Sequence, residues 1–524
     1  MKKFLILQTV LCVALTVKCA VALDSLTLLA TLVGENENDF MVQCASAGDV
    51  NNDGFDDIIV GATQLLMDRG YALIYFGGTE FDTIPDVRLI GEPFGPGGYS
   101  RFGVTVASAG DVNDDGYDDV LVGADFGWNG EVGWRTGKAF LFLGGEDMDS
   151  IPDVTFLGSF DDFEYFGGVI SSAGDINDDG YDDVIIGCPS YRGGWLSGRA
   201  YIYFGGQNMD NEYDICIQGG EGDFFGNSVN SIGDVNQDGY EDVLIGAACD
   251  GHTGFEGRAS IYFGGDPMDT TADVTFWGDS ASFKQVGSYI ASAGDVNGDT
   301  DPDVMIVGGY EHKRLKVFLG GPAMDTVPDV ILGGSHAISP AGDLNKDGFG
   351  DIMVSGTIFF GGDPMDTLPD ISLPTGGYRV AAAGDINKDG YEEVLLSTVG
   401  DTTWPGTVFV FTSEPTSVVQ DEEEQVVKSF RLHQNYPNPF NSVTAIQFDV
   451  EGSEYRAPIQ TTLRVYNIRG RLVRTLLTEK MAPGTYRVTW DGKDECGKEV
   501  ASGIYLYRVR AGSLIDTKKM LVLK

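Results

Sequence analysis

The chain has 524 residues and a formal net charge of −45, from 79 Asp and Glu against 34 Lys and Arg. Nucleic acids and anionic membrane surfaces are bound through basic footprints, so this balance argues against both as partners. The hydrophobic content of 42% is enough for a large core, and 73 glycines with 19 prolines indicate many tight turns between short strands.

The first residues have the features of a secretory signal peptide. Met1-Lys2-Lys3 is basic, the stretch from Phe4 to Thr16 is mostly apolar, and Ala20-Val21-Ala22 matches the small-x-small cleavage pattern. The apolar run is short for a transmembrane helix, which needs about 20 residues, and no later stretch approaches that length. We therefore predict a cleaved signal peptide at residues 1–22 and a secreted or cell-surface chain without a transmembrane segment.

A repeated motif dominates the next 390 or so residues of the sequence. One copy is SAGDVNDDGYDDVLVGA (Ser108–Ala124), and each copy is followed by β-branched and aromatic stretches bounded by glycine, which are strand signals. The stretch from one copy of the motif to the next is long enough for the four strands of one blade. A ring of such blades protects every sheet edge. We therefore predict an all-β fold with a seven-bladed β-propeller at residues 23–412. The seven copies begin at Asp49, Asp111, Asp175, Asp234, Asp295, Asp343 and Asp385.

The two ends of this region predict how the ring closes. The seventh unit stops at Thr407–Phe411, its third strand, and lacks a fourth. The segment Leu26–Gly34 has no unit of its own and resembles the fourth strands. We expect it to complete the last blade.

The aspartate loops carry the clearest chemistry. In D-x-N-x-D-G-x-x-D, side-chain oxygens fall at positions 1, 3, 5 and 9, a carbonyl serves at position 7, and glycine at position 6 permits the sharp turn around a hard cation. All ligands are hard oxygens, so the sequence predicts Ca²⁺, up to seven ions with a structural role. The predicted ligands are Asp49, Asn51, Asp53, Asp57, Asp111, Asn113, Asp115, Asp119, Asp175, Asn177, Asp179, Asp183, Asp234, Asn236, Asp238, Asp242, Asp295, Asn297, Asp299, Asp303, Asp343, Asn345, Asp347, Asp351, Asp385, Asn387, Asp389 and Glu393.

Two of the loops depart from this pattern, and two other interpretations apply to all seven. The fifth loop has Thr300 at the glycine position and the seventh has Glu393 at position 9, which leaves calcium binding open there. The loops would be plain polar turns on the alternative view, but three carboxylates in nine residues repel one another without a counter-charge. An EF-hand would need flanking helices and a glutamate at position 12, and neither is present.

These residues resemble the FG-GAP repeat family, which forms the propeller of integrin α chains. Phe102-Gly103, Phe166-Gly167 and Phe225-Gly226 supply the FG pair, and Gly123-Ala124 stands where the GAP falls. The resemblance covers Leu23 to about Ser413 and is weaker in the last three units. It implies calcium between strands 1 and 2 of a blade, and adhesion or ligand binding by the opposite face.

That opposite face carries the longest and least repetitive loops, between strands 2 and 3 of each blade. Exposed aromatic side chains on loops of a rigid scaffold predict a surface for a glycan or protein ligand. The alternative is that these side chains pack the loops against one another. The candidate ligand-binding residues are Trp128, Trp134, Tyr191, Arg192 and Trp195.

Catalysis finds little support, and we predict that the protein is not an enzyme. The chain has four histidines and no H-E-x-x-H, G-x-S-x-G or P-loop pattern. A calcium-dependent polysaccharide lyase or hydrolase using Tyr191, Arg192 or His252 is the first alternative. A structural surface-layer component is the second.

The composition changes at the C-terminal end. Residues 413–428 are polar and acidic and are predicted to be a linker, whereas Lys428 to Lys524 contains 16 Lys and Arg against 9 Asp and Glu. Six or seven short strand-like runs in residues 429–524 predict an Ig-like β-sandwich.

This region resembles the C-terminal sorting domains of the type IX secretion system and the related FlgD Ig-like module. NYPNPFN (Asn435–Asn441), VYNIRGRLVRTL (Val465–Leu476), SGIYLYRV (Ser502–Val509) and KKMLVLK (Lys518–Lys524) carry the resemblance. It implies that the chain is exported by the type IX secretion machinery, which would then be a partner of this domain. The alternative is a structural Ig module without a sorting role. The combined prediction is an exported, calcium-binding propeller that acts in adhesion or ligand binding.

Overall fold

The computed structural model divides into two compact units, Met1–Pro415 and Thr416–Lys524, which are described separately. No helix in the described residues is long and apolar enough to cross a membrane. The structure describes residues 26–523 except 35–38, 65–69, 92–99, 127–135, 147, 159–164, 190–196, 249–255, 279–284, 309–313, 323, 334–336, 374–376, 400–405, 414–428, 452–458, 468–471, 482–483, 495–496 and 512–513.

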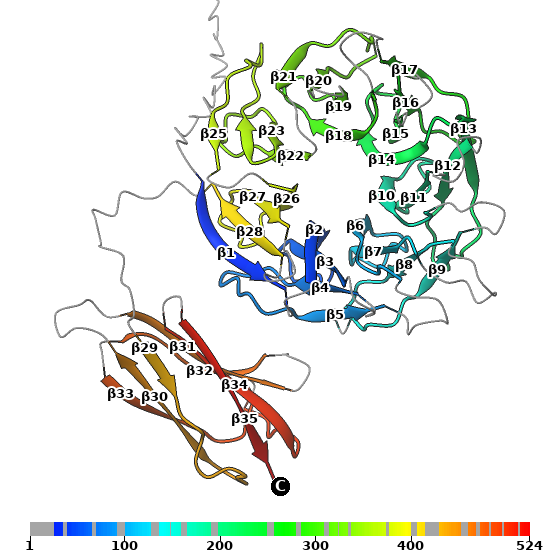
Figure 1. The fold of residues 1–524 in the computed structure, drawn as a ribbon. Coiled ribbons are helices and arrows are strands. Elements are labelled where there is room, and N and C mark those ends of the chain that lie inside the picture. Colours follow the sequence, from blue (N-terminus) through cyan, green and yellow to red (C-terminus); the bar gives the residue numbers. More distant parts are fainter. Residues whose placement is uncertain are drawn as a thin grey trace, which may run out of the picture. The chain divides into compact units, whose positions relative to one another are not determined.

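The first unit is a ring of seven antiparallel sheets with four strands each, which confirms the predicted propeller (Figure 1). Six sheets each use four consecutive strands, numbered here from the ring axis outward. They are β2 (Asp39–Gly48), β3 (Asp57–Gln64), β4 (Tyr71–Tyr75) and β5 (Val87–Ile90); β6 (Thr105–Gly110), β7 (Asp119–Ala124), β8 (Lys138–Phe142) and β9 (Val154–Leu157); β10 (Val169–Gly174), β11 (Asp183–Cys188), β12 (Ser197–Tyr203) and β13 (Ile215–Glu221); β14 (Phe225–Gly233), β15 (Asp242–Ala247), β16 (Arg258–Tyr262) and β17 (Val274–Trp277); β18 (Tyr289–Gly294), β19 (Asp303–Gly308), β20 (Arg314–Phe318) and β21 (Val330–Gly333); and β22 (Ile338–Gly342), β23 (Asp351–Val354), β24 (Thr357–Phe359) and β25 (Ile371–Ser372).

The seventh sheet joins the two ends of the ring, as the sequence predicts. It consists of β26 (Arg379–Gly384), β27 (Glu393–Thr398), β28 (Thr407–Thr412) and the N-terminal strand β1 (Thr27–Val33). β1 lies antiparallel to β28, with Val33 opposite Thr407 and Thr27 opposite Thr412. The first strand of the ring therefore provides the outer strand of its last blade.

The propeller core consists of seven apolar clusters, and each lies between two neighbouring blades. Between the first and second blades, Ile59 and Leu89 pack with Val120 and Phe142, and all four side chains are nearly inaccessible to solvent. The second strand of a blade is buried on both faces, which explains its continuous apolar, β-branched composition.

Close contact between blades explains the glycines of the repeat. A Cβ atom on Gly123 of β7 would collide with the carbonyl oxygen of Gly167 in the next blade. Gly167 has a φ of +76°, a conformation that side chains disfavour, and its neighbour Phe166 is 1% exposed in the core between the blades. The Phe-Gly and Gly-Ala pairs are thus the two sides of one inter-blade contact.

The second unit is a sandwich of two antiparallel sheets around a single core, as expected for an Ig-like domain. Trp490, Phe448 and Tyr507 are fully buried between the sheets. One sheet contains β29 (Ser429–Leu432), β30 (Thr444–Glu451) and β33 (Gly484–Trp490), and the other contains β32 (Leu472–Met481), β31 (Ile459–Asn467), β34 (Gly503–Ala511) and β35 (Leu514–Val522).

Candidate functional site

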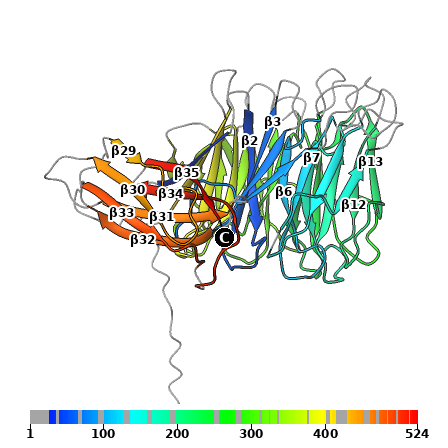
Figure 2. The ribbon, with the colours of Figure 1, turned by 90° about the horizontal axis from the view of Figure 1, so that it is seen from below.

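Each aspartate loop connects the first and second strands of a blade. In the second blade, β6 ends at Gly110, the loop follows, and β7 begins with Asp119, which is position 9 of the motif. All seven loops leave the same edge of the ring, because the first strands all run in the same direction along the axis. Figure 2 shows this edge-on arrangement of the blades.

Hydrogen bonds bring positions 1, 3 and 5 of each loop together. In the second blade, Asp111 Oδ1 and Asn113 Oδ1 accept from the N–H of Asp115, at 3.1 and 2.9 Å, and Asp111 Oδ2 accepts from the N–H of Gly116 at 2.8 Å. The same three bonds recur in the other six loops, including the two with divergent sequences. The loop fold therefore tolerates the changes in the fifth and seventh copies.

Backbone angles explain where glycine is needed. Position 6 has a positive φ throughout, +88° at Gly116 and +79° at Thr300 in the fifth loop. Threonine is β-branched and strained in this conformation, and the fifth loop places Gly298 at position 4, which is also in the left-handed region.

Position 9 is a buried anchor. Asp119 is inaccessible to solvent, and its two oxygens accept from the N–H groups of Val112 (3.0 Å) and Gly144 (2.7 Å). Burial raises the pKa of Asp119 to about 7; the two N–H donors oppose this, and the charges of Asp115 and Asp111 raise it further. The carboxylate thus ties the start of its loop to the end of the third strand of the same blade.

The chemistry of the donors fits a hard cation such as Ca²⁺. The loop offers only carboxylate and amide oxygens. Burial is the main cause of the raised pKa of Asp119, and the charges of Asp115 and Asp111 add to it; a bound cation would offset both effects. Within the described residues, no three His, Cys, Asp or Glu side chains lie together as a metal site. The carboxylates of Asp111 and Asp119 accept hydrogen bonds from backbone N–H groups.

A second set of acidic residues links neighbouring blades, and the sequence analysis did not identify it. Position 8 of one blade accepts from the N–H of position 1 in the preceding blade: Asp118 Oδ2 from Asp49 (2.7 Å) and Asp182 Oδ2 from Asp111 (2.8 Å). Asp56 Oδ2 accepts from Asp385 (2.8 Å), which connects the first blade to the seventh. The recurring acidic pair at positions 8 and 9 is the sequence signal for this link.

A glycine pair after the third strand completes the link between blades. The N–H of Gly144 donates to Asp119 of its own blade, and the N–H of Gly145 donates to the carbonyl oxygen of Val50 in the preceding blade, at 2.8 Å. The equivalent of the second bond occurs at Gly78, Gly206, Gly265, Gly321 and Gly362.

The predicted ligand-binding residues Trp128, Trp134, Tyr191, Arg192 and Trp195 lie outside the described residues, as does His252. Two ion pairs lie at the bases of the loops on that face. Arg101 Nη1 is 2.9 Å from Asp125 Oδ2, and Arg258 Nη2 is 2.7 Å from Asp223 Oδ2. In each pair, one residue precedes the first strand of a blade: Arg101 before β6 and Asp223 before β14. The other lies at an end of the loop between the second and third strands of the same blade: Asp125 after β7 and Arg258 at the start of β16.

Comparisons with known proteins match the repeats and the C-terminal unit separately. The FG-GAP repeat model matches residues 45–72, and the FlgD Ig-like domain model matches residues 443–514. Integrin alpha-5 of Xenopus laevis is 32% identical over 213 residues, covering 38% of this chain and 19% of that protein. Integrin alpha-6 of Gallus gallus is 34% identical over 173 residues, covering 32% and 15%, respectively.

The chain thus spans about a fifth or less of the length of these two curated relatives. A solved structure of PorZ, a bacterial surface component of the type-IX secretion system of Porphyromonas gingivalis, covers 94% of this chain and 60% of that chain at 14% identity. The TM-score of this match is 0.35. These matches confirm that the repeats resemble integrin α chains and that the C-terminal unit resembles the FlgD Ig-like domain.

Proposed function

We propose that the protein is a secreted or cell-surface calcium-binding propeller that acts in adhesion or ligand binding. The observation that carries this proposal is the sevenfold repetition of one carboxylate-rich loop, with the same internal hydrogen bonds in every copy. A turn needs no such concentration of acid, whereas a calcium loop does.

The calcium ligands in each loop would be the side chains at positions 1, 3 and 5, with the buried carboxylate at position 9 beside them. In the second blade these are Asp111, Asn113, Asp115 and Asp119. A bound Ca²⁺ supplies positive charge to a crowded anionic loop, which is a structural role. The loop residues themselves fix the turn and the inter-blade bonds around it.

Adhesion or ligand binding is supported by the similarity to integrin α chains and by the architecture. The loops between the second and third strands leave the edge of the ring opposite the aspartate loops. Variable loops on a rigid scaffold are the usual location of binding sites. We propose an extracellular glycan or protein as the ligand.

We propose export through a signal peptide at residues 1–22 and a sorting domain at residues 429–524, after a propeller at 23–412 and a linker at 413–428. The match of residues 443–514 to the FlgD Ig-like domain model supports the nature of the last domain. Deleting residues 429–524 should retain the protein inside cells that have a type IX secretion system. Normal secretion of the truncated chain would reject the sorting role.

The calcium proposal is tested by thermal unfolding of the purified chain in 10 mM or so of calcium and in chelator. With dissociation constants of about 10⁻⁴–10⁻³ M, each occupied loop should add about 1.5–3 kcal/mol to the free energy of unfolding. The double variant Asp111→Ala, Asp115→Ala should lose part of this gain in calcium. Identical unfolding of the wild type in calcium and chelator would reject structural calcium.

Asp210→Ala with Glu212→Ala is the matched control for that experiment. These exposed carboxylates lie between the third and fourth strands of the third blade, so the double variant makes the same change in net charge without touching an aspartate loop. It should keep the full response to calcium. A reduced response would mean that net charge, and not the loop, is responsible.

The ligand is sought by incubating the chain with a panel of polysaccharides and matrix proteins, in calcium and in chelator. Bound protein and released soluble sugar are measured in the same wells. Calcium-dependent retention without product supports the proposal. Released sugar would indicate a lyase or hydrolase, and binding only to itself would indicate a structural surface component.

A further inference from the structure

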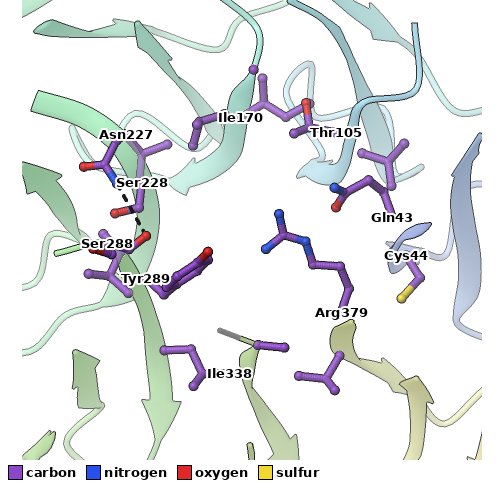
Figure 3. Close-up of a pocket in the computed structure, with 17 residues that line it drawn as sticks. Gln43, Cys44, Thr105, Ile170, Asn227, Ser228, Ser288, Tyr289, Ile338 and Arg379 are labelled. Carbon is purple, nitrogen blue, oxygen red and sulfur yellow. Dashed lines mark hydrogen bonds between the residues drawn. The ribbon is translucent and has the colours of Figure 1, made fainter. Parts of the chain in front are cut away.

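The axis of the propeller contains a cavity of about 250 Å³ that no predicted site uses (Figure 3). It is lined by the first strands of all seven blades. The register of the sheets places one equivalent residue from each blade around it, five residues before the glycine that ends the first strand. These seven residues are Gln43, Thr105, Val169, Ser228, Tyr289, Ala337 and Arg379.

The cavity lies toward the end of the axis that is opposite the aspartate loops. Arg379 is the first residue of β26 and Thr105 is the first residue of β6, whereas the aspartate loops follow the last residues of these strands. The site is therefore separate from the proposed calcium loops.

Among the described residues that line the cavity, Arg379 is the only charged one. Its side chain extends from β26 into the middle of the ring, where it lies between Tyr289 and Gln43 (Figure 3). Its Nε atom is buried and has no hydrogen-bond partner in the described part of the chain. The residue is partly buried, and its guanidinium carbon lies 5.6 Å from the centre of the Tyr378 ring. An aromatic ring does not satisfy the buried N–H, and a partly buried cation is stabilised by an anion, so this arrangement favours an anionic ligand.

The neighbours of Arg379 do not provide that partner. Burial raises the pKa of the Cys44 thiol to about 12, and burial likewise raises the pKa of Tyr289; the positive charge of Arg379 opposes both shifts. Both groups are therefore neutral near pH 7. A carboxylate would be the natural counter-charge, but none of the described residues that line the cavity carries one.

Two of the polar groups of the lining are hydrogen-bonded to the next blade, and one is not. The hydroxyls of Thr105 and Ser228 donate to backbone carbonyl oxygens of the next blade, at 2.9 and 2.7 Å. Gln43, opposite Tyr289 in Figure 3, makes no hydrogen bond through its amide within the described residues. Arg379 and Gln43 thus offer a charged and a neutral donor to one ligand.

We propose that this axial cavity binds a compact carboxylate, with Arg379 as its ion-pair partner and Gln43 as a second donor. The volume corresponds to about eight water molecules at about 30 Å³ each, which suits a single hydroxylated acid such as a hexuronic acid. A guanidinium pairs with a carboxylate through two parallel hydrogen bonds, so a carboxylate is the anion that this side chain selects best. This site goes beyond the proposed function and requires neither the calcium loops nor the loops of the outer face.

Isothermal titration of the full-length chain with glucuronate, and with glucose as the uncharged counterpart, tests the proposal. Glucuronate should bind and glucose should not. Arg379→Gln should weaken glucuronate binding roughly tenfold or more, since hydrogen bonds to charged groups are worth about 1.5–3 kcal/mol. Gln43→Leu should weaken it by a smaller factor.

Arg314→Gln is the matched control, because it removes one positive charge from an exposed position on β20. It should leave glucuronate binding unchanged. Thermal unfolding verifies that Arg379→Gln is folded; if it is not, Gln43→Leu and competition by acetate against glucuronate in the wild type decide the question. Equal binding of glucose, binding of sulfate but of no carboxylate, or undiminished binding by folded Arg379→Gln would each overturn the proposal.

Melting in calcium and chelator is measured on the same samples. A failure of carboxylate binding with an intact calcium response would reject the axial site alone. A missing calcium response with intact glucuronate binding would reject the calcium loops alone.

Discussion

The two units of this protein achieve a stable β-structure in different ways. The C-terminal sandwich has one continuous core, whereas the propeller divides its apolar contacts into seven clusters, each shared by two blades. The propeller adds a polar layer at one edge, where carboxylates accept N–H groups within a blade and between blades. A defect in the sandwich should therefore affect the whole unit, and a defect in the propeller should remain mostly between neighbouring blades.

The largest effect is expected for Trp490→Ala in the sandwich. Trp490 is fully buried and packs against Phe440 and Tyr505, so removing its side chain should cost about 3–5 kcal/mol. Differential scanning calorimetry should show one transition at lower temperature and the calcium-dependent transition unmoved. A shift of both transitions would mean that the two units do not unfold independently.

Asp119→Ala should have the next largest effect, and it separates the two roles of the loop carboxylates. It leaves the N–H groups of Val112 and Gly144 without an acceptor, which should cost about 2–4 kcal/mol in chelator, and more in calcium because Asp119 is also a proposed calcium ligand. Asp115→Ala should cost stability chiefly in calcium. Urea denaturation in both media measures the difference, and a cost of Asp119→Ala that vanishes in chelator would contradict the anchoring role.

Asp118→Ala tests the link between blades. It removes the acceptor for the N–H of Asp49, and we expect a loss of about 1 kcal/mol in the propeller transition. Asp118→Asn keeps an oxygen acceptor and is the matched control, with a smaller loss. Equal losses in the two variants would show that charge, rather than the hydrogen bond, matters at this position.

The smallest effect is a gain. Thr300 has a φ of +79°, so Thr300→Gly should relieve backbone strain and stabilise the propeller by about 0.5–1 kcal/mol. The reciprocal change Gly116→Thr, at the equivalent position of the second loop, should destabilise it by about 1–2 kcal/mol. Denaturation midpoints of the two variants should therefore move in opposite directions.

The fold was largely predictable because the sequence repeats its turn chemistry. The seven aspartate loops set the number of blades, and the unpaired strand signals at Leu26–Gly34 and Thr407–Phe411 predicted the closure of the ring. The spacing of the motif also indicated the loop carboxylates, although their assignment as calcium ligands stays a prediction.

The contacts between blades were not predictable in the same way. The acidic residue at position 8 is visible in the repeat, but its partner lies on the preceding loop, and only the three-dimensional packing defines that pairing. Arg379 gave no signal either, since the equivalent residue differs in all the other copies and the cavity that it enters is lined by residues of six other blades. Long-range contacts of this kind depend on how the sheets are arranged around the axis.

The closure of the ring has a consequence for how the chain reaches its folded state. β1 is the first strand of the propeller to be synthesised, and its partner β28 is the last. Until β28 is available, β1 is a strand with no partner, and the seventh blade has only β26 and β27, with an open edge. Contacts this distant in sequence form slowly, and an open edge is prone to pair with other chains. Closure is therefore the step at which a delay would favour aggregation over a finished ring.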